Sequence, residues 1–159
     1  MNIFYTNRDP VVCARDHCDK HCVKMILEYG QLLSTAHHEL GSATEQMYKS
    51  THKNHPSAVW ARSSSTHYQW LYRLLEALSE EYTNRYGKVH RTWLKLSKAL
   101  RESPRGIPNT DLVDPPQCMP DQYKCEDTVK AYRDYVRLDK EFAVWKYTKT
   151  PKWMNMKEL

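Results

Sequence analysis

The sequence predicts a mainly α-helical protein that folds as one domain over residues 1–159. Apolar side chains recur at helical spacing in several stretches, and no internal repeat is present. Glycine and proline fall between these stretches, as expected for helices joined by loops. A chain of 159 residues is also long enough to bury one core without disulfides or metals.

The first helix is expected to follow a short extended lead over residues 2–6. Asp9 is suited to cap this helix and Pro10 to open it, because proline is favoured at the first helical position. Two courses remain open beyond that point. The helix either continues to about His38 or breaks between residues 16 and 19.

Two further helices are predicted after a loop without periodicity over residues 41–57. Pro56 opens a short helix, and the serines at 63–65 are suited to cap a longer one. Tyr68, Leu71, Leu75, Leu78 and Tyr82 make that longer helix the strongest in the sequence. Its end is expected near Gly87, which provides a left-handed cap.

The last third of the chain is predicted to contain a helix over 89–100, a stiff loop and a final helix. The loop, at about 104–124, holds five of the eight prolines and is longer than most structureless connections, which suggests a functional role. The final helix is expected over 127–147. Its apolar residues at core spacing are Tyr132, Tyr135, Leu138, Phe142 and Trp145.

The composition limits the classes of function. The chain has 24 Lys and Arg against 19 Asp and Glu, a mild basic bias that permits a nucleic acid or nucleotide partner. Five cysteines, an odd number, and the lack of a long apolar stretch indicate a reduced, cytoplasmic protein without a membrane segment. For a phage-encoded chain this is the host cytoplasm. No C-x-x-C pair occurs, and we expect a monomer without metal or cofactor.

A narrow polar stripe on an otherwise apolar helix is the strongest functional signal. At 100° per residue its members lie within roughly 80° of one another. They are His17, His21, Lys24, Glu28, Gln31 and Thr35. A cleft lined by imidazole, ammonium and carboxylate groups explains this stripe. The alternative is an ordinary solvent face, on which Lys24 and Glu28 form an exposed i,i+4 pair.

A second polar cluster precedes the short helix. It consists of Lys53, Asn54 and His55, directly before Pro56. Trp60 offers an aromatic surface for a base, although its helical spacing also suits the core. In the proline-rich loop, a lid is predicted that contributes hydrogen bonds to the substrate. Its residues are Gln117, Tyr123 and Lys124.

Together these two segments resemble the pyrimidine-dimer DNA glycosylase (phage endonuclease V-like) family. Bacterial relatives carry a D-R-R-L-x-K-x-x-x-E-x-x-Q helix followed by an N-H-P-x-x-x-W motif. The matching positions here are Asp19, Lys24, Glu28, Gln31 and the run 54–60, with conservative changes at 20 and 21. A Pro-x-Trp near the C-terminus of the phage enzyme is similar to residues 151–153.

The resemblance implies a compact helical enzyme of the endonuclease V type that acts on duplex DNA and cleaves a glycosidic bond, then the backbone. Glu28 matches the catalytic carboxylate and His21 a histidine that contacts the substrate. We expect Lys24 to be a third catalytic candidate and also a phosphate ligand. The remaining candidates for substrate binding are Lys20, Gln31, Lys53, Asn54, His55, Trp60, Arg62, Tyr123 and Lys124.

The amine that such an enzyme uses is less clear from the sequence. The best-known member attacks with the α-amine of a threonine exposed by removal of the initiator methionine, whereas this chain begins Met1-Asn2. Removal of the methionine normally requires a small second residue, so Met1 is expected to stay. The nucleophile is then the α-amine of Met1 or the side chain of Lys24. Otherwise Glu28 activates water for a simple hydrolysis.

Two other classes of function remain open. An enzyme on the same scaffold could act on free nucleotides or nucleotide signals, and a variant of it is a metal-dependent hydrolase that uses His17, His21 and Glu28. The chain could also be a phage protein that binds nucleotides or DNA without catalysis.

Overall fold

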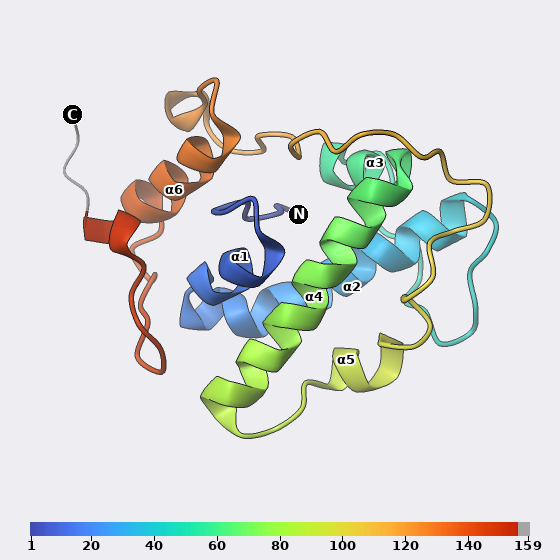
Figure 1. Ribbon diagram of the computed structural model, residues 1–159, viewed down its shortest axis with the longest axis horizontal. Helices are drawn as coiled ribbons and strands as arrows, with labels where there is room; N and C mark the ends of the chain where they lie inside the picture. The colour runs from blue at the N-terminus through green and yellow to red at the C-terminus, as the bar shows by residue number, and fades with distance from the viewer. Residues whose placement is uncertain (156–159) are drawn as a thin grey trace.

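The computed structural model describes residues 1–155, and helices with their connecting loops form all of this range (Figure 1). Two of the elements are short 3-10 helices. In chain order the elements are α1 (Pro10–Asp16), α2 (Asp19–Glu39), α3 (Pro56–Ser63), α4 (Ser65–Tyr86), α5 (Arg91–Leu96), η1 (Asp121–Tyr123), α6 (Thr128–Asp139) and η2 (Lys152–Asn155). The predicted mainly α fold is confirmed.

The first helical stretch is broken, which was one of the two courses open from the sequence. Asp9 caps α1 by accepting a hydrogen bond from the Val11 N–H at 2.9 Å. His17 and Cys18 then adopt extended backbone angles, and α2 begins at Asp19. The break turns the chain so that α1 and α2 pack against α4 as separate helices.

The long helix α4 is the centre of the fold, and its predicted caps are confirmed. Ser64 accepts a hydrogen bond from the Thr66 N–H, and Gly87 ends the helix with a φ of 73°. Figure 1 shows α4 crossing α2, with α3 at one end and the proline-rich chain running outside them to α6. No helix within residues 1–155 has the length and apolar character needed to cross a membrane.

Two predicted helices end earlier than expected. Helix α5 stops at Leu96, because Tyr72 and Tyr68 donate hydrogen bonds to the carbonyls of Ser97 and Leu100 in the turns that follow. Helix α6 stops at Asp139 instead of Tyr147.

Residues 140–147 leave the helix because they form backbone hydrogen bonds elsewhere. The Asp19 N–H donates to the Val144 carbonyl at 2.9 Å, and the Lys146 N–H donates to Asp19 Oδ2 at 2.7 Å. The prediction that all five apolar residues of this region belong to the core is therefore wrong in part. Leu138 and Phe142 are exposed, while Tyr132, Tyr135 and Trp145 are buried.

The N-terminal segment threads through the core. Residues 3–6 are all buried, and Arg133 holds the Thr6 carbonyl at 2.8 Å. The Tyr29 hydroxyl accepts a hydrogen bond from the Phe4 N–H at 3.2 Å and donates one to His17 Nε2 at 2.7 Å. Because both Tyr29 and His17 are buried, this network fixes the course of the chain before α1.

Removing the Tyr29 hydroxyl tests this anchoring. Tyr29→Phe leaves the Phe4 N–H and one nitrogen of His17 buried without a partner. We expect the free energy of unfolding to fall by about 2 kcal/mol or more. The matched control Tyr147→Phe changes an exposed hydroxyl and should alter stability by less than about 0.5 kcal/mol. Urea unfolding measures both, and equal stabilities of the two variants would contradict the anchoring role.

Candidate active site

The first half of α2 and the N-terminal segment meet at a hollow of about 200 Å³, here called the Glu28 cleft. Three separate parts of the chain line it. The lining residues are Met1, Asn2, Phe4, Lys20, His21, Lys24, Met25, Glu28, Lys140 and Phe142. The structure therefore brings together four residues of the predicted site, Lys20, His21, Lys24 and Glu28, on consecutive turns of one helix.

Glu28 holds an unused hydrogen-bond acceptor inside this cleft. Its Oε2 atom is buried and has no hydrogen-bond partner within the described residues. The Lys24 ammonium lies 3.6 Å from that oxygen, close enough for attraction but too far for a hydrogen bond. A buried carboxylate oxygen without a partner is unusual in folded proteins, so Glu28 is free to accept a proton or stabilise a nearby cation.

His21 is enclosed between two aromatic rings. Phe4 stacks on the imidazole with ring centres 4.1 Å apart, and Phe142 meets it edge-on at 5.3 Å. Burial lowers the pKa of His21 to about 3, and the charges of nearby cations, including Lys140 and Lys24, add to this effect. His21 is therefore neutral at physiological pH and offers hydrogen bonds rather than a charge.

Positive charge surrounds the cleft. Lys20 places its Nζ 4.2 Å from the centre of the Phe142 ring, and Lys140 donates to the Tyr135 hydroxyl at 2.8 Å. Burial lowers the pKa of Lys140, but the Tyr135 hydroxyl and the Asp139 carboxylate outweigh it and raise the pKa overall. Three lysines against one carboxylate favour an anionic ligand.

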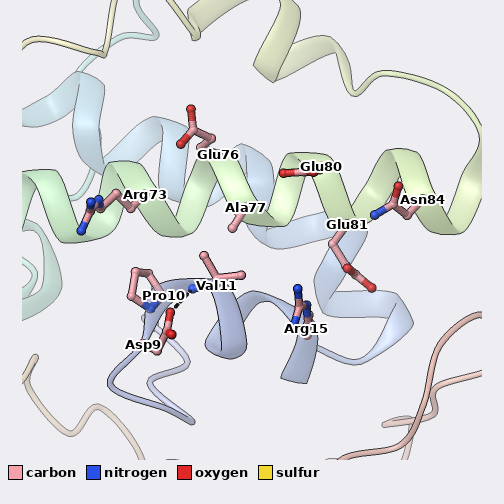
Figure 2. A pocket seen from close by; sticks show the side chains of 10 residues that line it. All are labelled: Asp9, Pro10, Val11, Arg15, Arg73, Glu76, Ala77, Glu80, Glu81 and Asn84. Atoms are coloured by element: carbon pink, nitrogen blue, oxygen red, sulfur yellow. Dashed lines mark hydrogen bonds between the residues drawn. The ribbon is translucent and has the colours of Figure 1, made fainter.

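A larger hollow, of about 550 Å³, lies between α1 and α4 and has the opposite electrostatic character. Figure 2 shows its charged side chains, which come from α1, its N-cap and α4. They are the carboxylates Asp9, Glu76, Glu80 and Glu81 and the guanidinium groups Arg15 and Arg73. An excess of carboxylates repels phosphates, so the smaller Glu28 cleft is the better candidate for a nucleic acid substrate.

The predicted cluster before α3 adjoins the N-terminus. His55 caps α3, since its Nδ1 accepts a hydrogen bond from the Ser57 N–H at 3.1 Å. Its pKa is lowered by burial and also by the positive charge of the Met1 amine. Met1 thus lies between the Glu28 cleft and His55.

The other members of this cluster lie at the surface. Lys53 and Asn54 are exposed, with Lys53 Nζ 4.0 Å from a carboxylate oxygen of Glu39. Arg62 is half-buried and donates to the Lys53 carbonyl at 2.7 Å, so it braces the loop that carries these two residues. Gln31 is half-buried one turn beyond Glu28 and does not line the cleft.

Four further predicted residues lie away from the cleft. Trp60 is buried, donates to the Val113 carbonyl at 2.9 Å and stacks on His67, which is a core environment. Tyr123 packs on Tyr135, and Lys124 pairs with the adjacent η1 helix. Gln117 is bonded within its own loop, to the Cys125 carbonyl at 2.7 Å. The predicted lid over the cleft is not formed by these side chains.

His17 is not placed to act as a metal ligand, as the alternative of a metal-dependent hydrolase requires. Both ring nitrogens of His17 are engaged, Nδ1 with the Cys13 carbonyl at 2.8 Å and Nε2 with the Tyr29 hydroxyl. Within residues 1–155, no three His, Cys, Asp or Glu side chains are grouped as metal ligands. Thr35 also leaves the stripe, because it is buried and bonded to the backbone of Thr51.

Five lining residues were missed by the sequence analysis, namely Asn2, Phe4, Met25, Lys140 and Phe142. Phe4 lies in a segment that was expected only to be extended, and Lys140 and Phe142 lie in a region that was expected to be helical. No motif marks them. Phe4, Lys140 and Phe142 reach the cleft because distant parts of the chain hold the two segments that carry them.

The buried histidines predict loss of stability in acid. Burial lowers the pKa of His17 to about 4 and that of His21 to about 3, from an ordinary value of 6.5. Below pH 6.5 the unfolded chain therefore binds more protons than the folded protein. Each histidine should lower the free energy of unfolding by up to about 1.4 kcal/mol per pH unit between pH 6 and pH 4.

Urea unfolding at several pH values measures this loss. His21→Gln should reduce the pH dependence by about one proton's contribution, while His52→Gln, which changes an exposed histidine, should not. A pH dependence unchanged by His21→Gln would contradict a buried, neutral imidazole.

A scan against protein families matches residues 1–95 to the family described as pyrimidine dimer DNA glycosylase. Searches of curated proteins and of solved structures gave no match. The matched range is 95 of 159 residues, and it holds α1 to α4 and every lining residue of the Glu28 cleft except Lys140 and Phe142. By this match over more than half of its length, the chain belongs to the pyrimidine dimer DNA glycosylase family.

Proposed function

We propose that this protein is a DNA glycosylase that removes a damaged or modified pyrimidine from duplex DNA, with Glu28 as the catalytic carboxylate. One observation carries the proposal. The family-matched helix α2 presents a buried carboxylate oxygen without a hydrogen-bond partner in a cleft surrounded by lysines. The lysines attract the phosphates, and the free oxygen faces the sugar that they position.

The carboxylate acts on a cationic transition state. When the glycosidic bond breaks, the electron pair of that bond leaves with the base and positive charge develops at C1′ of the sugar. Glu28 stabilises this charge from within the cleft, where water is partly excluded. The departing base takes up a proton. An amine that attacks C1′ forms a new C–N bond and, after opening of the sugar, an imine.

The α-amine of Met1 is the nucleophile that this geometry favours. Met1 lines the cleft with Glu28. Attack requires an unprotonated amine, and α-amines have an ordinary pKa roughly 2.5 units below that of lysine. Lys24 is the alternative amine within the cleft, and its Nζ lies 3.6 Å from Glu28 Oε2.

Backbone cleavage follows from the same intermediate. The imine makes the C2′ proton acidic, and its removal expels the 3′ phosphate by β-elimination. Water then releases the sugar remnant and regenerates the amine. Glu28 lines the same cleft as Met1 and carries protons in these later steps. Lys20, Lys24 and Lys140 hold the flanking phosphates.

The size of the cleft argues against a free nucleotide as substrate. Pockets that enclose small molecules usually measure about 300–1,000 Å³. The Glu28 cleft, at about 200 Å³, is too small to surround a nucleotide. A duplex that lies across the exposed side of α2 needs to insert only a sugar and its base. The exposed side chains on that side of α2 include Lys20, Lys24 and Leu27.

Cleavage of ultraviolet-irradiated duplex tests the role of Glu28. Glu28→Gln removes the charge and keeps the size, and we expect the rate to fall by at least about 100-fold with DNA binding retained. The matched control is Glu76→Gln, the same change in the acidic hollow, which should retain the wild-type rate. Undamaged duplex should stay intact. Wild-type activity in Glu28→Gln, or no cleavage by the wild type, would overturn the proposal.

A further inference from the structure

We propose that Asp19 is a positioning residue that docks residues 140–147 against the Glu28 cleft and so makes this wall segment part of the substrate-binding site. The wall segment lies outside the family-matched residues 1–95, yet it supplies Lys140 and Phe142 to the cleft. The inference rests on the proposed function for its substrate, but the docking itself is a property of the fold.

Three hydrogen bonds fasten the wall segment to the junction of α1 and α2. The Asp19 N–H donates to the Val144 carbonyl at 2.9 Å, and the Lys146 N–H donates to Asp19 Oδ2 at 2.7 Å. The buried Trp145 adds its indole N–H to the Asp16 carbonyl at 3.1 Å. Asp19 therefore binds the segment through both its backbone and its side chain.

The other carboxylate oxygen of Asp19 connects the segment to α4. Arg85 donates to Asp19 Oδ1 at 3.3 Å, and its side chain is only 1% exposed. Glu81 pairs with the same arginine at 3.0 Å, and within the described residues it forms no hydrogen bond or ion pair with the wall segment. Two carboxylates thus neutralise one buried guanidinium, and only one of them also holds the wall segment.

The docked wall segment shapes the cleft beside the catalytic carboxylate. Phe142 closes over the edge of His21 at 5.3 Å while 39% of its surface stays exposed. Lys20 from α2 lies over the same ring at 4.2 Å, and Lys140 adds a second ammonium. An exposed aromatic ring flanked by ammonium groups suits a DNA strand, because it offers an apolar surface beside phosphate ligands.

Steady-state kinetics on irradiated duplex separate positioning from simple stabilisation. A structural defect reduces the folded fraction and hence the apparent kcat, whereas KM does not depend on that fraction. We expect Asp19→Asn and Phe142→Ala each to raise KM about 5- to 10-fold, equivalent to roughly 1 kcal/mol of binding. The double variant should be no worse than Asp19→Asn alone, because undocking the wall segment already removes the contact that Phe142 makes.

Glu81→Gln is the matched control. It disturbs the same buried arginine without touching the wall segment, so its KM should equal that of the wild type. Trp145→Phe loosens the segment without changing the charges around Arg85, and it should raise KM in the same direction even if Asp19→Asn does not fold. An unchanged KM in Asp19→Asn, or the same rise in Glu81→Gln, would overturn the inference.

Trypsin provides a readout that does not depend on catalysis. Lys140 and Lys146 lie in the wall segment, and cleavage after them should accelerate in Asp19→Asn but not in Glu81→Gln. Equal cleavage in the two variants would contradict the docking. If the wild type cleaves no DNA while this protease difference is found, the proposed function fails and the docking stands.

Discussion

The buried Arg85 holds the helices in the arrangement that the cleft requires. It donates to the carbonyls of Arg15 and His17 at 3.0 and 2.8 Å, where α1 ends, and to Asp19, where α2 begins. The unsatisfied carbonyls at the end of α1 thus find a donor from α4. Since one side chain fixes both helix ends, it sets the direction in which α2 leaves the break, and with it the direction of Glu28.

The same junction accounts for the composition of the site. Glu28 lies about two and a half helical turns after Asp19, so the start of α2 fixes its position. The wall segment docks on Asp16 and Asp19, and the N-terminal segment is held by Tyr29 and His17 next to the break. Three stretches that are remote in sequence therefore meet at the cleft. Helix α2 begins at the break, and the wall segment bonds to Asp16 and Asp19 beside it. The N-terminal segment bonds to Tyr29, which in turn bonds to His17 in the break.

Local signals in the sequence were sufficient for the helices and for the α2 side of the cleft. Asp9 and Ser64 mark helix starts through their side-chain oxygens, and Gly87 marks a helix end through its backbone, and these predictions were confirmed. His21, Lys24 and Glu28 follow the period of one helix, so their proximity was also predictable. The predicted polar stripe lost one residue from each end. His17 lies in the break between α1 and α2, and Thr35 bonds to the backbone of Thr51.

The parts of the fold and of the site that the sequence did not predict depend on contacts between residues far apart in the chain. Residues 140–147 have helical periodicity, and hydrogen bonds to Asp19 and Asp16 hold them in a non-helical course instead. Trp60 carries the family motif, yet its indole N–H finds a carbonyl in the proline-rich loop. A sequence pattern cannot predict such partners, because they come from segments brought together by the tertiary fold.

Several lysines around a buried carboxylate oxygen that accepts no hydrogen bond from the described residues distinguish the Glu28 cleft from the larger acidic hollow. Chemistry on a phosphate-bearing strand needs both, the cations to hold the strand and the carboxylate to meet the positive charge that forms when the base leaves. His21 contributes shape and hydrogen bonding, since burial keeps it neutral. The site thus combines lysine side chains at its rim with a buried carboxylate oxygen at its centre.

We propose that an amine in the Glu28 cleft attacks the sugar. Borohydride reduction during cleavage of irradiated duplex, followed by peptide mapping, measures this directly, once intact mass has shown that Met1 carries a free amine. We expect a covalent adduct at Met1. An adduct at an amine outside the cleft, such as Lys149, or cleavage without any trapped adduct, would contradict it.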